Sequence, residues 1–286
     1  MIPSQFEYAA PATLNEAVAL LAKDPDAKAL AGGHSLLPVM KLRLASPSML
    51  VDLRNVAELR GVSANGGGWR IGAMTTHAQI AGNANLKGYQ ALIDATSIIG
   101  DAQVRNRGTI GGSLAHADPA ADLPAVVVAL NATLNVVGPK GVRAIAIDGF
   151  FEGMMATTLG EGEVITSVDL PALAADAVSA YAKFANPASG YAMVGVAAQA
   201  TLSGGVARNV RVVLTGASDH ATRLTQVESA LEGQALTAAS IAAACAQAGA
   251  GLDLMGDIHA SAEYRRAMVD VYARRALAKA LERAGG

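Results

Sequence analysis

Two short glycine-rich segments are the parts of this chain best suited to chemistry. Residues 31–35 read Ala-Gly-Gly-His-Ser and residues 109–113 read Thr-Ile-Gly-Gly-Ser, each after an apolar run and before a plausible helix. Glycine lets the backbone approach a phosphate, and free N–H groups at the start of a helix favour negative charge. Ser35 and Ser113 each add a hydroxyl. Together the two turns could hold one pyrophosphate from two sides, although either alone is also typical of an ordinary tight turn.

The common nucleotide-binding fingerprints are absent. In the segment Gly-Gly-Gly-Trp-Arg-Ile-Gly, residues 66–72, Ile71 occupies the place of the third glycine of a G-x-G-x-x-G motif. No G-x-x-x-x-G-K-[ST] segment occurs either. A Rossmann site and a P-loop site are therefore disfavoured.

Ser113 also permits a hydrolase interpretation. The segment Gly-Gly-Ser-Leu-Ala resembles the nucleophile elbow G-x-S-x-G, and Asp122 or Asp148 with His220 or His259 could complete a triad. Such a serine should follow a strand directly, and Val-Arg-Asn-Arg-Gly-Thr-Ile is a poor strand. We therefore rank a serine hydrolase low.

The segment His-Ala-Asp-Pro-Ala-Ala-Asp, residues 116–122, brings three possible metal ligands together. Three ligands so close in a loop with proline rarely converge on one ion, so we expect no metal site. The simpler interpretation is that Asp118 caps a helix that starts at Pro119, leaving Asp122 in the following turn, within reach of a ligand.

Composition narrows the classes of protein. The 286 residues carry a formal net charge of −2, so binding to nucleic acid is not favoured. The single cysteine, Cys245, allows neither an intrachain disulfide nor a thiolate-bound cluster, and we expect it to be a packing residue. No signal peptide or membrane span is recognisable, so we expect a cytoplasmic protein.

The periodicity of the chain predicts a mixed α/β first part and an α+β second part, with a boundary near residue 176. A segment at 100–124 shows almost no regular period, and segments this long without structure are often functional. The turn Ser-Gly-Gly at 203–205 indicates a hairpin. Helices are predicted at 13–23, with Asn15 as N-cap, and at 36–45, 89–99, 222–232, 236–249 and 261–283, and strands at 27–32, 48–54, 68–76, 163–171 and 206–216.

These motifs, in this order, resemble the flavin-binding medium subunit of the aerobic, molybdenum-containing carbon monoxide dehydrogenases, and more broadly the FAD subunit or domain of the xanthine dehydrogenase family. The resemblance covers essentially the whole chain. Any one motif is weak, but the ordered set is specific. The matching segments are FEYAAPATLNEA, LAGGHSLLPVMKLRLASP, LVDLRNVAEL, WRIGAMTTHAQI, VRNRGTIGGSLAHADPAADLPA, GEVITSVDLP and AEYRRAMVDVYARRAL.

The resemblance implies an α+β fold in two domains. The first, residues 1–176 with subdomains of about 1–57 and 58–176, would be an FAD-binding domain of the vanillyl-alcohol-oxidase-like (PCMH) type. The second, residues 177–286, would be a smaller C-terminal flavoprotein domain of the carbon monoxide dehydrogenase type, with a sheet and helices. Noncovalent FAD would lie between the two domains, where cofactor sites are common.

The resemblance also implies the site residues. Both glycine turns would clamp the pyrophosphate of one extended FAD, and relatives often carry Asn where this chain has Ser113. Asp122 matches an acidic residue that hydrogen-bonds FAD, Lys183 a lysine near the flavin, and Tyr191 a residue near the isoalloxazine ring. The full set is Ala31, Gly32, Gly33, His34, Ser35, Leu36, Ile99, Thr109, Ile110, Gly111, Gly112, Ser113, Asp122, Ile165, Lys183 and Tyr191.

The resemblance implies an oxidoreductase subunit that does not oxidise substrate alone. A large subunit would carry molybdopterin and a small subunit two [2Fe–2S] clusters, in a dimer of heterotrimers (a heterohexamer). Electrons would reach FAD from the clusters and leave to a quinone, a cytochrome or NAD. The substrate of the complex, carbon monoxide, an aldehyde, a purine or another N-heterocycle, stays open, as does peripheral membrane association. A stand-alone FAD oxidoreductase and a nucleotide-binding assembly module that has lost flavin also remain alternatives.

Overall fold

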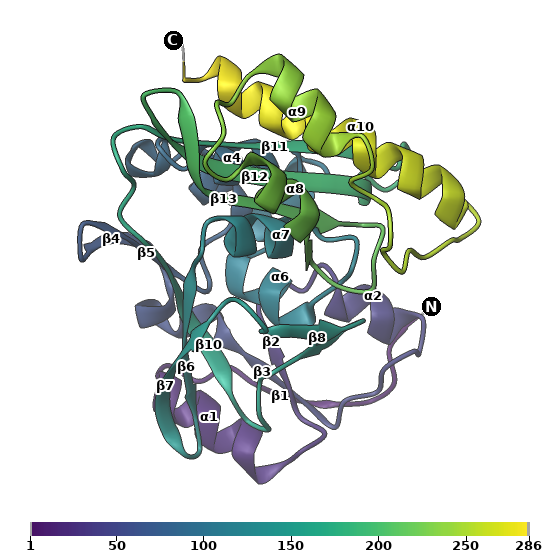
Figure 1. Ribbon diagram of the computed structural model, residues 1–286. Coiled ribbons are helices and arrows are strands. Elements are labelled where there is room, and N and C mark those ends of the chain that lie inside the picture. The colour runs from purple at the N-terminus through teal and green to yellow at the C-terminus, as the bar shows by residue number, and fades with distance from the viewer. Residues whose placement is uncertain (1, 285–286) are drawn as a thin grey trace.

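The computed structural model describes residues 2–284 and has two layers of strands with helices between and above them (Figure 1). The helices are α1 (Leu14–Lys23), α2 (Leu36–Lys41), α3 (His77–Ala81), α4 (Gln90–Ile98), α5 (Ala102–Arg107), α6 (Ile110–His116), α7 (Asp122–Ala129), α8 (Thr225–Leu231), α9 (Ala238–Cys245) and α10 (Ala262–Glu282), with 3-10 turns at Leu53–Asn55, Ala57–Leu59 and Ala84–Leu86. The strands are β1 (Glu7–Ala9), β2 (Lys28–Leu30), β3 (Met49–Asp52), β4 (Val62–Asn65), β5 (Gly68–Gly72), β6 (Thr133–Gly138), β7 (Gly141–Ala146), β8 (Phe151–Gly153), β9 (Ala156–Thr157), β10 (Val164–Leu170), β11 (Ala177–Ala185), β12 (Ala192–Ser203), β13 (Val206–Thr215) and β14 (Thr222–Arg223).

The first part of the chain contains two main sheets. A small sheet has the order β1-β3-β2 with all strands parallel, and a larger antiparallel sheet has the order β4-β5-β10-β6-β7. In the small sheet Leu30 pairs with Asp52, so β2 and β3 end together. The first glycine turn leaves the sheet at this carboxyl end, where parallel sheets typically place ligands.

The second part is a four-stranded antiparallel sheet, ordered β11-β12-β13-β14. Side chains alternate between the faces of a strand, so Val194, Val196 and Ala198 of β12 pack on the cluster formed with α8, α9 and α10. Ala197, between them, faces the other way, into the cluster formed by the first part. The sheet is therefore covered by its own helices on one face and by α4 and α7 on the other.

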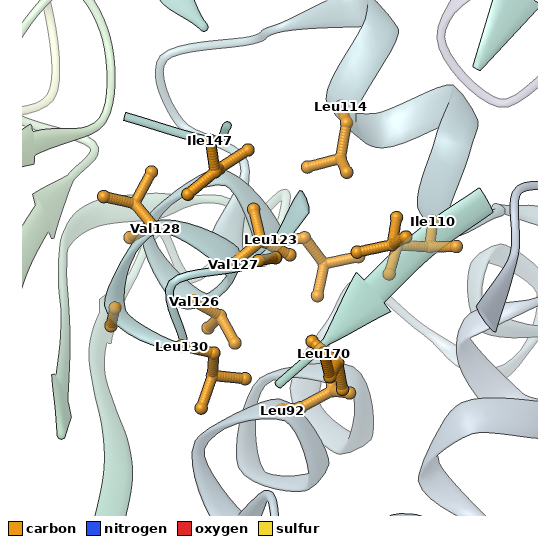
Figure 2. Close-up of a cluster of buried hydrophobic side chains, with 14 of the residues drawn as sticks. Leu92, Ile110, Leu114, Leu123, Val126, Val127, Val128, Leu130, Ile147 and Leu170 are labelled. Carbon is orange, nitrogen blue, oxygen red and sulfur yellow. The ribbon is translucent and has the colours of Figure 1, made fainter. Parts of the chain in front are cut away.

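The largest hydrophobic cluster surrounds α7, whose residues are all buried. Figure 2 shows Leu123, Val126, Val127 and Val128 of α7 grouped with side chains from α4, α6 and β10. A helix that carries only apolar residues after its first position is typical of the protein interior. Asp122, the first residue of α7, is thereby carried into the interior at the edge of this cluster.

The fold confirms the predicted class: it is a mixed α+β chain whose second part is a sheet with helices. The predicted cap of the first helix is wrong. Thr13, not Asn15, is the N-cap: its hydroxyl accepts a hydrogen bond from the N–H of Glu16 at 3.3 Å, while its own N–H donates to the Glu16 carboxylate. This capping box satisfies two backbone donors at once.

The segment at 100–124 is less irregular than predicted. It holds α5, α6 and the start of α7, which are too short to show a clear period. The predicted helix start at Pro119 is also wrong, because the helix begins at Asp122. Asp118 instead accepts a hydrogen bond from the N–H of Ala120 at 2.8 Å, in a local turn.

Candidate functional site

A cavity of about 450 Å³ lies between the two glycine turns and extends to the start of the second sheet. Most residues expected at the site line it: Ala31, Gly32, Gly33, His34, Ser35, Leu36, Ile99, Thr109, Gly111, Gly112, Ser113, Asp122, Ile165 and Tyr191. Ile110 and Lys183 do not. The chain therefore gathers fourteen of the sixteen expected residues, from six separate segments, around one cavity.

The first turn presents a row of unpartnered backbone donors. Gly33 has φ +76°, a conformation that L side chains rarely adopt, and this reverses the chain directly after β2. Within residues 2–284 no group accepts a hydrogen bond from the N–H groups of residues 32–36. Because buried or half-buried N–H groups normally find a partner, such a row is suited to an anion with several oxygen atoms.

Gly32 brings the two glycine-rich regions together. A Cβ atom on Gly32 would lie 2.2 Å from the carbonyl oxygen of Arg107 and 2.9 Å from the Cα of Gly108. The first turn can therefore approach the backbone that leads into the second turn only because this position has no side chain. The close approach makes both turns walls of the same cavity.

The second turn is built differently from the first. The N–H of Ile110 donates to the Thr75 carbonyl at 3.1 Å, and the N–H of Gly111 donates to the Ala73 carbonyl at 2.9 Å. A Cβ atom on Gly111 would lie 2.5 Å from that of Ala73. Gly111 thus serves close packing, and the Ile110 side chain, which is fully buried, belongs to the hydrophobic core.

Hydroxyl groups replace the backbone donors at the second turn. Thr109 is the N-cap of α6 and its Oγ1 accepts a hydrogen bond from the N–H of Gly112 at 3.2 Å. Ser113 follows on the cavity wall. In the part of the chain that the structure describes, neither hydroxyl hydrogen has a protein acceptor, so both can donate to a ligand in the cavity.

Asp122 lines the cavity and belongs to a buried polar cluster. Its carboxylate accepts hydrogen bonds from the Tyr181 hydroxyl at 2.6 Å and from Lys183 Nζ at 3.1 Å. Burial raises the pKa of the Asp122 carboxyl, while the charge of Lys183 and the Tyr181 hydrogen bond act in the opposite direction. Burial, followed by the charge of Asp122, raises the pKa of the Tyr181 phenol well above its ordinary value, which keeps this phenol a donor.

Tyr191 covers the cavity from the side of the second sheet. Tyr191 is 42% exposed and lines the cavity together with Ser189 and Gly190. Burial and the charge of Asp118 raise the pKa of the Tyr191 phenol, and the hydroxyl of Ser35 lowers it. The phenol is therefore close to the first glycine turn, so a residue of the second part reaches across the opening toward the first part.

His77 and Tyr181 belong to the site but were not expected there. His77 lines the cavity beside Gly108, and burial, with a smaller contribution from His34, lowers the pKa of its imidazole to about 4. Its Nδ1 is buried without a partner among residues 2–284. The strand pattern could have revealed Tyr181, because Tyr181 and Lys183 are two positions apart in β11 and so share a face.

The hydrolase interpretation finds no support in the geometry. Ser113 lies inside α6 rather than on a turn after a strand, and in residues 2–284 it has no hydrogen bond to a histidine. His220 Nδ1 lies 2.6 Å from the carboxylate of Asp219, outside the cavity. The arrangement of nucleophile, base and orienting acid that a triad requires is missing.

Comparisons with known proteins agree with this geometry. Residues 4–173 match the model of the FAD-binding domain in molybdopterin dehydrogenase, and residues 179–280 match the model of the CO dehydrogenase flavoprotein C-terminal domain. The carbon monoxide dehydrogenase medium chain of Hydrogenophaga pseudoflava is 40% identical over 279 residues, with 97% of each chain covered. The nicotine 6-hydroxylase medium subunit of Paenarthrobacter nicotinovorans is 38% identical over 274 residues, with 96% of each covered.

A solved structure shows the same fold over nearly the full length. A chain in the structure of the H. pseudoflava carbon monoxide dehydrogenase that lacks the Mo-pyranopterin moiety superposes with a TM-score of 0.95, at 42% identity and with 99% of each chain covered. The chain is a flavoprotein subunit of the FAD-binding type. It belongs to the family of FAD-binding medium subunits of molybdenum-dependent dehydrogenases, which includes the carbon monoxide dehydrogenase medium chains.

The residues present fit FAD. The unpartnered donors of the first turn and the free hydroxyls of Thr109 and Ser113 suit the two phosphates, because each phosphate oxygen accepts several hydrogen bonds. Gly32 and Gly112 form a wall that side chains would fill: a Cβ on Gly112 would lie 2.8 Å from Thr109 Oγ1. Apolar side chains such as Ile99, Leu53 and Ile165 line the rest of the cavity, as ring systems require.

Within residues 2–284, no helix is both long enough and apolar enough to cross a membrane.

Proposed function

We propose that this chain is the FAD-carrying electron-transfer subunit of a molybdenum hydroxylase complex, placed between the [2Fe–2S] clusters of a small subunit and an external electron acceptor. The observation that carries the proposal is the single cavity shared by both glycine turns and Tyr191. When bound, FAD supplies the one- and two-electron redox chemistry. The chain's own residues bind it, orient it and set the polarity around it.

The proposed FAD site divides the work among its residues. The N–H groups of residues 32–36 and the hydroxyls of Thr109 and Ser113 hold the pyrophosphate. Gly32, Gly33, Gly111 and Gly112 make room for it. Ile99, Ile165 and Tyr191 surround the ring system. Asp122 and Lys183 stabilise the neighbouring wall of the cavity through their contact with each other. Ile110 contributes through packing alone. In this proposal residues 1–176 form the FAD domain and residues 177–286 the domain that closes it.

The proposal includes partners that the chain itself does not contain. Two related subunits belong, by their printed names, to a carbon monoxide dehydrogenase and a nicotine 6-hydroxylase, so relatives of similar identity serve different substrates. We infer that a large molybdopterin subunit selects the substrate, and that the complex is a cytoplasmic dimer of heterotrimers. The present cavity is filled by the cofactor and leaves substrate choice to the partner.

Co-expression with the candidate large and small subunits tests the proposal. The purified complex is treated anaerobically with carbon monoxide, aldehydes, purines and N-heterocycles in turn, and the flavin and iron–sulfur absorption bands are followed. We expect one substrate class to bleach both bands, and we expect reduction of an external acceptor to stop in a complex whose medium chain carries no FAD. Acceptor reduction at an unchanged rate in that flavin-free complex would refute the proposal.

A further inference from the structure

Lys183 holds three different segments of the chain at one point. Its side chain is only 3% exposed, and Nζ donates to the carbonyls of Gly190 at 2.8 Å and Ile98 at 3.1 Å and to the carboxylate of Asp122 at 3.1 Å. An ammonium group has three donors and no acceptor. All three donors of Lys183 are therefore engaged by the protein itself, and none remains to bind a ligand.

The loop at residues 186–191, whose Gly190 carbonyl binds Lys183, is held together by its own hydrogen bonds. The N–H of Asn186 donates to the Tyr191 carbonyl at 2.8 Å, and the N–H of Gly190 donates back to the Asn186 carbonyl at 2.9 Å. The buried side chain of Asn186 also accepts hydrogen bonds from the N–H groups of Ala188 and Ser189, at 2.9 and 3.1 Å. A loop bonded in this way moves as a unit, so fixing Gly190 fixes Tyr191 as well.

We propose that Lys183 is a positioning residue: from its anchor on Asp122 it holds loop 186–191, and with it Tyr191, across the opening of the cavity. This inference rests on the proposed function, since the cavity is taken to be the FAD site. Lys183 acts on the cofactor only through the loop. Its burial supports this role, because a buried lysine is costly unless its charge is paired and its donors are satisfied.

A second hydrogen bond to Asp122, from Tyr181, stabilises the contact between Asp122 and Lys183. Asp122 accepts from Tyr181 as well as from Lys183, and Tyr181 lies on the same face of β11 as Lys183. Asp122 belongs to the first part of the chain and Lys183 to the second. The same contact that holds the loop therefore also joins the two parts at the edge of the cavity.

Amide hydrogen exchange in the FAD-free chain tests directly whether Lys183 holds loop 186–191 in place. The variants are Lys183→Met and the double variant Lys183→Met/Asp122→Asn, in which no unpaired carboxylate remains. In both, we expect the amides of Ala188, Ser189 and Gly190 to exchange about tenfold faster or more. This is roughly the effect of losing the one hydrogen bond from Lys183 to the loop. The matched control is Lys279→Met. Lys279 also pairs with an aspartate across the two parts, Asp94 at 2.9 Å, but has no contact with the loop.

Unchanged exchange of these three amides in both Lys183 variants, or an equal acceleration in Lys279→Met, would overturn the proposal. This arm needs no cofactor. It therefore decides the role of Lys183 even if the chain binds no FAD, a result that would instead refute the proposed function.

The rate of FAD dissociation from the full-length chain supplies the second test. If Lys183 acts through Tyr191, then Lys183→Met and Tyr191→Ala each increase the rate of FAD dissociation. The double variant should then release FAD no faster than the faster of the two single variants, because the two residues act through the same contact. Independent, multiplying effects in this double-mutant cycle would contradict the proposal, because Lys183 would then act on FAD by another route.

Discussion

The free hydroxyl of Ser113 is the simplest single group to test. In the proposed FAD site, Ser113→Ala removes one donor to a phosphate and leaves α6 intact. Because a hydrogen bond to a charged group contributes about 1.5–3 kcal/mol, FAD should bind roughly 10- to 150-fold more weakly, as measured by equilibrium titration of the flavin-free chain.

The control is Ser97→Ala. Ser97 donates to the Ile93 carbonyl at 2.7 Å on an exposed helix surface, away from the cavity. Equal affinities of Ser113→Ala and Ser97→Ala for FAD would show that Ser113 does not contact the cofactor.

His77 gives the chain a predictable response to acid. Burial lowers the pKa of the folded-state imidazole to about 4 from an ordinary value of 6.5. As the pH falls from 6.5 to 4 the unfolded chain binds this proton first, so the free energy of unfolding falls by up to about 1.4 kcal/mol per pH unit. Denaturant unfolding of His77→Gln should show a flatter pH profile in this window, while the exposed His259→Gln should follow the unmodified chain. If the free energy of unfolding changed with pH in the same way in all three proteins, the lowered pKa of His77 would be contradicted.

At the scale of elements, the approach of the two glycine turns is the decisive contact. Gly32→Ala places a Cβ 2.2 Å from the Arg107 carbonyl oxygen, so the turns must separate. We expect a loss of FAD affinity of at least about tenfold together with about 1–3 kcal/mol of destabilisation from overpacking. Gly153→Ala is the matched control, because its added Cβ would meet only the Asp219 carboxylate, at 3.7 Å. Unchanged FAD binding by Gly32→Ala would show that the close contact is not needed.

The elements also show what a sequence can predict. The two turns and the helices that follow them could be recognised because glycine and the capping residues act locally, as Thr109 does at the start of α6. The meeting of Asp122 with Lys183 could not, since these residues are 61 positions apart and their contact depends on how the second sheet packs on α7. For the same reason, the sequence could not predict that the two turns differ in their free backbone donors. The carbonyls of Ala73 and Thr75, which accept from the N–H groups of the second turn, come from a segment far away in the sequence.

At the scale of the whole molecule, the second part holds the first part where the cavity needs it. Thr215 Oγ1 lies 2.8 Å from the carbonyl oxygens of both Pro119 and Ala121, which share its one donor, and the N–H of Gly216 donates to the Pro119 carbonyl at 2.8 Å. Arg283, which follows α10, pairs with Asp94 of α4 at 2.8 Å. The contacts of Thr215 and Gly216 fix the segment between α6 and α7, and the Arg283–Asp94 pair joins α4 to the second part of the chain. The walls of the cavity therefore depend on both parts of the chain.

The most direct measurement is a titration of FAD into the purified full-length chain, followed by gel filtration and an absorption spectrum of the protein peak. We predict close to one FAD retained per chain, and a clear loss of flavin in Gly32→Ala but not in Gly153→Ala. Where the isolated chain retains none, the same spectrum is taken of the complex with its large and small subunits. A correctly folded chain that carries no flavin in either form would contradict the central claim that the cavity between the two glycine turns is an FAD site.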